Sequence, residues 1–254
     1  MVDNKDESLI SHLEALRETL LKCLISLCIV IPFTLWLSPY ALNFLVKVIA
    51  GSDKVSFNFF SPMEVFMLQL KAALLLDVIV CFPYMAKKIW DFILPALYDN
   101  EKKFIKTVAF ASTFLFLLGA CFCIFVIMPI VVKFGLSFAG ENITPVFGLS
   151  NIINLTLVMA ASFGAMFQMP LITIALVKSG VISYESLSDK RPYVIVIILI
   201  LAAIFTPPDV ISQLMLGTPT YLLFEAGLLL ARKYKNQEKC MADENYQEVE
   251  QNNE

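Results

Sequence analysis

The feature that most constrains this chain is a series of long apolar runs. We identify six of them, at 20–42, 63–86, 107–133, 150–178, 192–205 and 210–231. A helix of about 20 consecutive apolar residues is long enough to cross a bilayer, and runs of this length are rare in the cores of water-soluble domains. Only 16% of the residues are charged, against about 25% in soluble domains. The sequence therefore predicts an all-α integral membrane protein with six transmembrane helices.

The segments outside these runs differ in character. Residues 1–19 and the start of the first run place Ile10, Leu13, Leu16 and Leu20 at helical spacing among charged residues, which is typical of an amphipathic helix at a membrane surface. The first run lacks the small-residue cleavage site of a signal peptide, so we expect it to remain as a span. Residues 232–254 are rich in Glu, Gln and Asn, which predicts a disordered tail. We expect an amphipathic N-terminus (1–19), a six-helix transmembrane domain (20–231) and a disordered tail (232–254).

The basic residues predict the orientation of the helices. Fifteen of the nineteen lysines and arginines lie on one side of the predicted spans, three (Lys47, Lys54 and Lys133) lie on the other, and Lys71 lies within a span. Because cytoplasmic loops carry the excess of basic residues, we expect both termini and the basic 86–106 loop to face the cytoplasm.

The last two runs are unusual in length and composition. A helix over 192–205 would be roughly 21 Å long, against a hydrocarbon core of about 30 Å. The turn that follows it, Thr206–Asp209, is therefore expected below the outer surface, or in a locally thinned bilayer. Pro219 is expected to bend or break the sixth helix. We predict that the fifth and sixth spans are short or broken.

Residue types that support catalysis or metal binding are scarce. His12 is the only histidine, five of the six cysteines lie inside apolar runs, and the sequence contains no CxxC pair and no GxxxxGK[ST] phosphate loop. These features argue against a paired-histidine metal site and a nucleotide-binding loop, and they leave a histidine-based triad only His12. We expect no enzyme, cofactor or metal, and the net charge of −3 does not indicate nucleic-acid binding.

Polar side chains inside the apolar runs are candidates for function, because a charge at the bilayer centre costs about 2.5–3.5 kcal/mol on the insertion scale. They are Glu64, Lys71, Asp77, Gln168 and Glu225. Glu64 and Lys71 are seven residues apart and share a helix face, while Asp77 and Gln168 are expected at similar depth, where a hydrogen bond could join them. Gln168 either ties two helices together or acts in function, and Glu225 snorkels, pairs with a basic group or is protonated. A secondary transporter with these five residues around a small-solute site is the alternative function.

The 86–106 loop combines basic, acidic and aromatic residues. It contains five lysines together with Asp91, Asp99, Glu101, Trp90, Phe92, Tyr98 and Pro95. Such loops mainly set topology, and interfacial aromatics mainly anchor at the headgroups. A carboxylate there would also suit an arginine-bearing peptide, because arginine forms bidentate charge-assisted bonds with carboxylates. The composition of the loop leaves both interpretations open.

Six short motifs occur in a fixed order along the chain. They are Ser11–Arg17 (SHLEALR), Ser61–Glu64 (SPME), Trp90–Tyr98 (WDFILPALY) with Glu101, Phe163–Pro170 (FGAMFQMP), Lys190–Tyr193 (KRPY), and Thr206–Asp209 (TPPD) with Ser212 and Gln213. In order and spacing these motifs resemble the TatC family, the multispan component of the twin-arginine translocase.

The resemblance implies a receptor that binds the twin-arginine signal peptides of folded precursors at the cytoplasmic face, with export driven by the proton-motive force. It implies that Glu101 pairs with a signal arginine and that Phe92, Glu14, Leu16, Arg17, Pro95 and Lys103 belong to the same region. From the polar residues inside the runs and from these motifs together, we expect intramembrane or partner contacts at Gln168, Glu64, Lys71, Asp77, Asp209, Gln213 and Glu225. The implied partners are TatA- and TatB-type single-span proteins and further copies of the chain, and the implied location is the bacterial cytoplasmic (inner) membrane.

Two positions depart from the family pattern. Ala15 stands where members usually have glutamate, with Glu14 one residue earlier, and a shift of one residue turns a helical side chain by about 100°. Gln168 stands where many members have glutamate within the fourth span. Glutamine cannot ionise, so only a hydrogen-bonding role is expected there.

Overall fold

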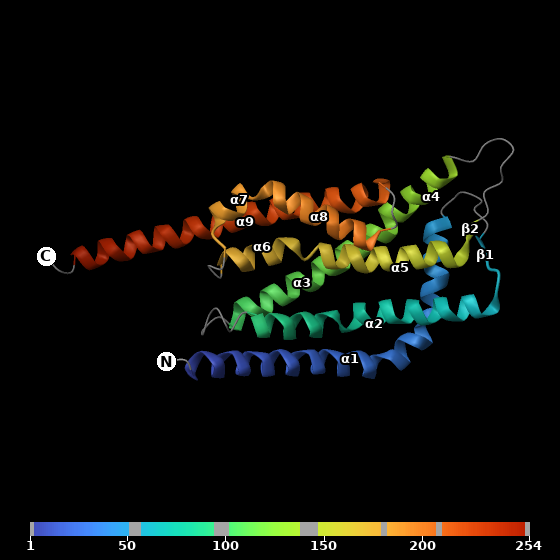
Figure 1. Cartoon of the computed structure of the whole chain (residues 1–254), viewed down its shortest axis with the longest axis horizontal. Coiled ribbons are helices and arrows are strands. Elements are labelled where there is room, and N and C mark those ends of the chain that lie inside the picture. Colours follow the sequence, from blue (N-terminus) through green and yellow to red (C-terminus); the bar gives the residue numbers. More distant parts are fainter. Residues whose placement is uncertain are drawn as a thin grey trace. The chain divides into compact units, whose positions relative to one another are not determined.

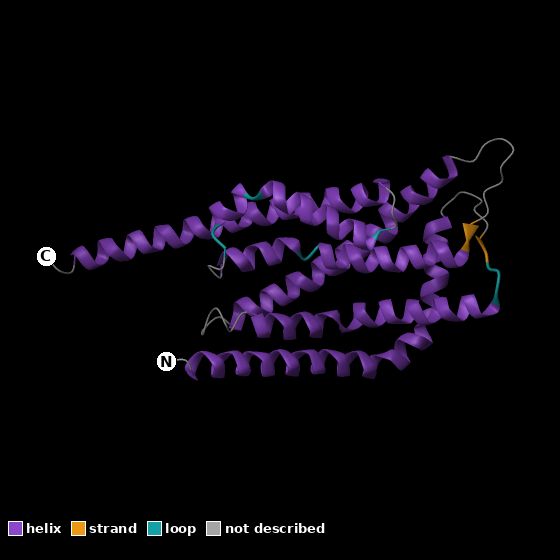
Figure 2. Ribbon diagram, in the orientation of Figure 1, coloured by secondary structure: helices purple, strands orange, loops and turns teal. Residues whose placement is uncertain are grey.

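The chain folds almost entirely into helices (Figures 1 and 2). The structure, a computed structural model, describes residues 3–50, 57–93, 102–137, 147–178, 182–206 and 210–251, without the side chains of 3–12, 102–105, 211 and 233–251. It divides into two compact units, Met1–Gly164 and Ala165–Glu254.

Unit 1 contains five α-helices and one π-helical turn among the described residues. In chain order these elements are α1 (Asp3–Ala50), α2 (Pro62–Ile93), α3 (Lys102–Phe122), the π-helical turn η1 (Cys123–Ile127), α4 (Met128–Ser137) and α5 (Leu149–Met166). Helix α5 ends two residues beyond the unit. Two short strands, β1 (Phe57–Asn58) and β2 (Phe147–Gly148), pair in parallel with Phe57 opposite Phe147. The apolar runs do not predict this pair, because each strand is only two residues long.

Unit 2 contains α6 (Met169–Lys178), α7 (Tyr184–Asp189), α8 (Arg191–Phe205) and α9 (Val210–Gln251). α9 packs against α6, α7 and α8. The short α7 begins at a capped end, where the Ser183 side chain accepts a hydrogen bond from the backbone N–H of Ser186. Such a cap satisfies one of the free N–H groups at a helix start.

Helix α1 is bent near its C-terminal end (Figure 1). It is 48 residues long and contains Pro32 and Pro39. Proline cannot donate a backbone hydrogen bond, so Pro39 leaves the carbonyl of Leu35 without its usual helical donor. The Ser38 hydroxyl donates to that carbonyl at 2.9 Å, which is how membrane helices tolerate a proline. The segment predicted as a separate amphipathic N-terminus is, from Asp3 onward, the first part of this same helix.

Prolines also interrupt the third and fourth predicted spans. The third is one apolar stretch, Lys106–Ser137, but it contains the π-helical turn η1 just before Pro129. The fourth, Leu149–Lys178, breaks at Phe167–Gln168, two residues before Pro170. There the backbone N–H of Gln168 donates to Ala165 and its carbonyl accepts from Ile172. A proline disfavours helix at the preceding residue and removes one backbone bond, which accounts for the break.

Among the residues that the structure describes, five helical stretches are long and apolar enough to cross a membrane, and α8 is a shorter apolar helix. Five of the six predicted runs thus correspond to helices long enough to span, and the fifth run, 192–205, is the short one that we expected. The prediction of a break at Pro219 is wrong, because α9 continues through it without interruption.

The structure also differs from the prediction for the C-terminal tail. Residues 232–251 continue α9 as helix, whereas the composition predicts disorder. Residues 232–254 contain five Glu, three Lys and three Gln, which have good helix propensity. Low hydrophobicity indicates that a segment cannot build a core, but it does not prevent an exposed helix from extending a buried one.

The apolar surface of both units is large. Ile29, Trp36, Phe110 and Tyr193 are 68–76% exposed, whereas Leu68, Ile153 and Phe163 are at most 1% exposed. A water-soluble protein rarely exposes so much contiguous apolar surface. The arrangement fits helices that face lipid on one side and one another on the other.

Candidate functional site

Three helix ends of unit 1 meet close to the residues implicated in peptide recognition. The Cys81 thiol on α2 lies 3.5 Å from the Ser26 carbonyl on α1. The rings of Phe82 and Phe116 stack with centroids 3.8 Å apart, which joins α2 to α3. At about 1.5 Å per residue, Glu14 lies roughly 18 Å along α1 from Ser26, and Phe92 lies roughly 17 Å along α2 from Cys81. The start of α1, the end of α2 and the start of α3 therefore lie at the same end of the bundle (Figure 1).

The side chains at this end of α1 are available to a ligand. Glu14, Leu16 and Arg17 are all exposed. One turn further along, Glu18 and Lys22 form an exposed ion pair at a spacing of four residues. Glu14 and Arg17 lie on adjacent turns, so this surface presents one carboxylate and one guanidinium beside an apolar side chain.

Helix α2 extends further toward this end than expected. The segment predicted as the 86–106 loop is helix up to Ile93, and α3 begins at Lys102. Trp90 is buried and belongs to the core, while Phe92 is half-buried. Lys88 lies over the Tyr84 ring, with its Nζ 5.8 Å from the ring centroid. Of the two described aromatics of this segment, Phe92 is therefore the one that can contribute surface to a ligand.

Three of the predicted recognition residues cannot be placed from the structure. Glu101 and Pro95 lie outside the described residues, and so does the side chain of Lys103. Helix α3 begins at the residue after Glu101. The assignment of these three side chains to a binding site stays a prediction.

Glu64 and Lys71 on α2 have separate partners. Glu64 accepts a hydrogen bond from the backbone N–H of Phe60 at 2.9 Å, so it caps the start of the helix. Lys71 donates to the Asn154 side chain on α5 at 2.8 Å, and Asn154 donates in turn to the Ser150 hydroxyl at 3.4 Å. Sequence reasoning did not identify Asn154, although it is a polar residue within an apolar run.

Asp77 is buried at the contact between α1 and α2, with 1% of its surface exposed. The Cys81 thiol lies 3.8 Å from its carboxyl oxygen and 3.5 Å from the Ser26 carbonyl, so its one proton can serve only one acceptor at a time. Gln168 belongs to the other unit, at the break between α5 and α6. A hydrogen bond between Asp77 and Gln168 stays a prediction.

In unit 2, polar contacts tie α8 to α9. Arg191 and Glu225 form an ion pair, with the arginine Nε 3.1 Å from the carboxylate oxygen, and the Tyr221 hydroxyl donates to the same oxygen at 2.8 Å. The buried Nε makes no hydrogen bond within the described residues, so the Arg191 contact is charge attraction without an aligned bond. Of the three alternatives for Glu225, which were snorkelling, pairing with a basic group and protonation, the structure supports pairing with a basic group.

Gln213 makes the second contact between these helices. Its side-chain amide donates to the backbone carbonyl of Leu199 at 3.0 Å. Leu199 lies more than one turn before the end of α8 at Phe205, so this bond joins α9 to the middle of α8. At the end of α8, both the backbone N–H and the hydroxyl of Thr206 donate to the Ala202 carbonyl at 2.9 Å. Asp209 lies outside the described residues.

Replacing Arg191 with methionine is expected to destabilise unit 2 by about 1 kcal/mol, because Glu225 keeps its charge and loses its cation while the site is partly exposed. The thermal stability of the purified protein in detergent would report the loss. The double variant Arg191→Met/Glu225→Gln should recover part of it. A double variant that is no more stable than the single one would contradict the role of the ion pair.

Comparison with known proteins identifies the family. The model of the family described as Sec-independent protein translocase protein (TatC) matches residues 11–219. The chain belongs to the TatC family. TatC of Haemophilus influenzae is 34% identical over 256 residues, which cover 98% of this chain and 99% of that protein. TatC of Aquifex aeolicus is 33% identical over 227 residues, which cover 88% of this chain and 94% of that protein.

Solved TatC structures have the same fold. Two crystal structures of the twin-arginine translocase receptor TatC, one of them in DDM, match with a TM-score of 0.79 at 32% identity. The match covers 87% of this chain and 99% and 98% of those chains. Membership of the TatC family makes the chain a membrane-embedded component of a protein translocase and not an enzyme. The small-solute transporter is therefore set aside.

Proposed function

We propose that this TatC-family chain is the receptor and core subunit of a twin-arginine translocase. In this role it binds the twin-arginine signal peptides of folded precursor proteins and organises their export, which the proton-motive force drives. TatA- and TatB-type single-span proteins and further copies of the chain assemble around it in the bacterial cytoplasmic membrane.

The observation that carries the proposal is the common end of α1, α2 and α3. The contacts of Cys81 with Ser26 and of Phe82 with Phe116 bring Glu14 and Phe92 to one level, at the end of the bundle where α2 ends and α3 begins, and Glu101 directly precedes α3 in the sequence. A guanidinium group forms its strongest bonds with carboxylates, and an aromatic side chain offers an apolar surface for the flanking residues of a peptide.

The charge distribution supports the topology that this function requires. In the proposed arrangement all six predicted helices span the membrane, both termini are cytoplasmic, and the α1–α2–α3 end faces the cytoplasm. The α1–α2–α3 end contains five basic residues, Arg17, Lys22, Lys87, Lys88 and Lys102. Cytoplasmic segments of membrane proteins carry such an excess of basic residues. Helix α8, with 15 residues, is roughly 22 Å long and would span a locally thinned bilayer.

The test is the discrimination between two peptides that differ only in the paired basic residues. The purified chain in nanodiscs should bind a signal peptide with Arg-Arg more tightly than the same peptide with Lys-Lys, by about tenfold or more, because lysine cannot form the bidentate bond. Fluorescence anisotropy of labelled peptides would measure both affinities. Empty nanodiscs are the control, and equal affinities for the two peptides would refute the proposed receptor function.

A further inference from the structure

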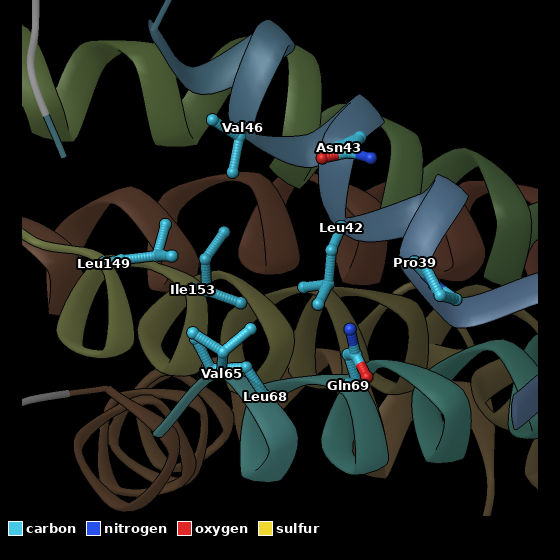
Figure 3. A pocket seen from close by; sticks show the side chains of 9 residues that line it. All are labelled: Pro39, Leu42, Asn43, Val46, Val65, Leu68, Gln69, Leu149 and Ile153. Carbon is cyan, nitrogen blue, oxygen red and sulfur yellow. The ribbon is translucent and has the colours of Figure 1, made fainter. Parts of the chain in front are cut away.

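A cavity of about 140 Å³ lies in unit 1 between α1, α2 and α5 (Figure 3). Its walls are mostly apolar and include Leu42 of α1, Leu68 of α2 and Ile153 of α5. Leu68 and Ile153 are each 1% exposed and form its closed side, whereas Pro39 and Asn43 of α1 are exposed at its rim. The cavity is therefore open to the surroundings of the helices along α1.

The bend of α1 accounts for the position of the cavity. Pro39 lines it, and the bent part of α1 continues across α5 as Leu42, Asn43 and Val46 (Figure 3). The Ser38 hydroxyl already satisfies the Leu35 carbonyl that Pro39 leaves free, so this carbonyl does not need a ligand in the cavity. What remains is space between side chains of three helices.

Two side-chain amides at this cavity have no hydrogen-bond partner among the described residues. Neither Asn43 nor Gln69 makes a hydrogen bond with any part of the chain that the structure describes, whereas the neighbouring Lys71 bonds to Asn154. The Gln69 amide points from α2 toward Leu42 on α1 (Figure 3). An amide in a bilayer needs a hydrogen-bond partner, because no bulk water is available to it.

The level of these amides indicates which partner they meet. Gln69 follows Glu64 by five residues, roughly 8 Å along α2, and Asn43 lines the same cavity from the part of α1 that crosses α5. Lys47 lies in the last turn of α1 and Glu64 in the first turn of α2, and charged side chains near the ends of membrane helices reach the interface, so we expect the membrane boundary at this level. The amides therefore lie just inside that boundary, where the ester carbonyls of phospholipids are found and can accept hydrogen bonds from amide N–H groups.

The apolar walls indicate what fills the rest of the cavity. An engineered apolar cavity of about 150 Å³ stays free of water and binds benzene or xenon, so a space of this size and lining suits a hydrocarbon group. A whole helix, about 10 Å across, is too wide to enter. Water would satisfy the amides but would leave Leu42, Leu68 and Ile153 hydrated.

We propose that this cavity binds one phospholipid, with part of an acyl chain between Leu42, Leu68 and Ile153 and an ester carbonyl at the amides of Asn43 and Gln69. In the topology proposed above, the lipid belongs to the outer leaflet. The site itself does not depend on the receptor function, since it lies at the opposite end of α1 and α2 from Glu14 and Phe92.

The test is photo-crosslinking of the full chain in nanodiscs of phosphatidylethanolamine and phosphatidylglycerol that contain a small share of phosphatidylethanolamine with a diazirine in its acyl chain. After illumination, mass spectrometry of peptides would locate the adducts. We expect several-fold more adduct per residue in 39–46 and 65–69 than around the exposed, lipid-facing Phe110 and Phe114. Equal yields would reduce the lipid to ordinary annular contact and overturn the proposal.

Filling the cavity provides the matched variant. Ile153→Phe should reduce the adduct in 39–46 and 65–69 several-fold, and Ile200→Phe, at a position that is 55% exposed on α8, should leave it unchanged. Should Ile153→Phe fail to fold, Val46→Phe fills the same cavity from its half-buried edge. Adducts that persist in the filled variant would overturn the proposal. Rapid labelling of a cysteine at position 69 by a membrane-impermeant reagent would also overturn it, because it would place water in the cavity.

Discussion

Replacing Glu101 with lysine is expected to abolish the binding of a peptide with paired arginines. The variant removes the carboxylate proposed to accept the guanidinium and puts a like charge in its place. Losing one partner of a hydrogen-bonded charge pair costs about 2 kcal/mol or more, which corresponds to at least a thirtyfold loss of affinity. Photo-crosslinking of a labelled Arg-Arg peptide to the chain in nanodiscs would measure the loss.

Two variants at the same end of the bundle separate charge from structure. Glu101→Gln keeps the size of the side chain and removes its charge, so its affinity should lie between those of the original chain and Glu101→Lys. Lys103→Ala removes a nearby cation and should change binding far less than charge reversal at Glu101. All three variants should insert into the membrane normally. Undiminished crosslinking of the peptide to Glu101→Lys would remove Glu101 from the binding site.

The membrane helices follow from the sequence because burial in lipid depends on composition over a long window. A bilayer has no hydrogen-bonding solvent, so each apolar run must satisfy its backbone internally as a helix. Five of the predicted runs are accordingly long apolar helices, and the fifth run, 192–205, is the short helix α8, as its 14 residues predict. The TatC family was likewise recognisable from its motifs, and the family model covers residues 11–219.

Proline had different effects at positions that look alike in the sequence. Pro170 lies beside a helix break, yet Pro219 lies within the continuous helix α9. The cost of a proline depends on whether neighbouring groups can satisfy the freed carbonyl and accommodate the ring. At Pro39 the Ser38 hydroxyl does so. Such compensation depends on local geometry, so counting prolines did not predict which helix would break.

Partners across helices were the least predictable part of the site. Lys71 and Glu225 stand out in the sequence as charges within apolar runs, but their partners Asn154 and Arg191 lie 83 and 34 positions away. Only helix packing brings such pairs together, and a single sequence does not contain the register of one helix against another. Tyr221 could have been found, because it precedes Glu225 by four residues and thus shares its helix face.

Replacing Gly227 with alanine is expected to destabilise unit 2 by about 1–2 kcal/mol. A Cβ at this position would lie 2.7 Å from the Cα and 3.0 Å from the carbonyl oxygen of Pro170 on α6. Both are backbone atoms, so α6 and α9 would have to move apart, and overpacking of this kind costs about 1–3 kcal/mol. Alanine gains about 1 kcal/mol of helix propensity over glycine, which offsets only part of that cost. The melting temperature in detergent should fall by several degrees.

Gly135→Ala is the matched control, because it makes the same substitution where there is room. Gly135 lies in α4, and a Cβ there would be no closer than 3.7 Å to the Phe147 ring, an ordinary contact. The helix-propensity gain should then act alone, so this variant should be slightly more stable than the original chain. The two substitutions should thus shift the melting temperature in opposite directions. An increase for Gly227→Ala would mean that α6 and α9 do not approach as closely as Pro170 and Gly227 indicate, and that small-residue packing does not hold unit 2 together.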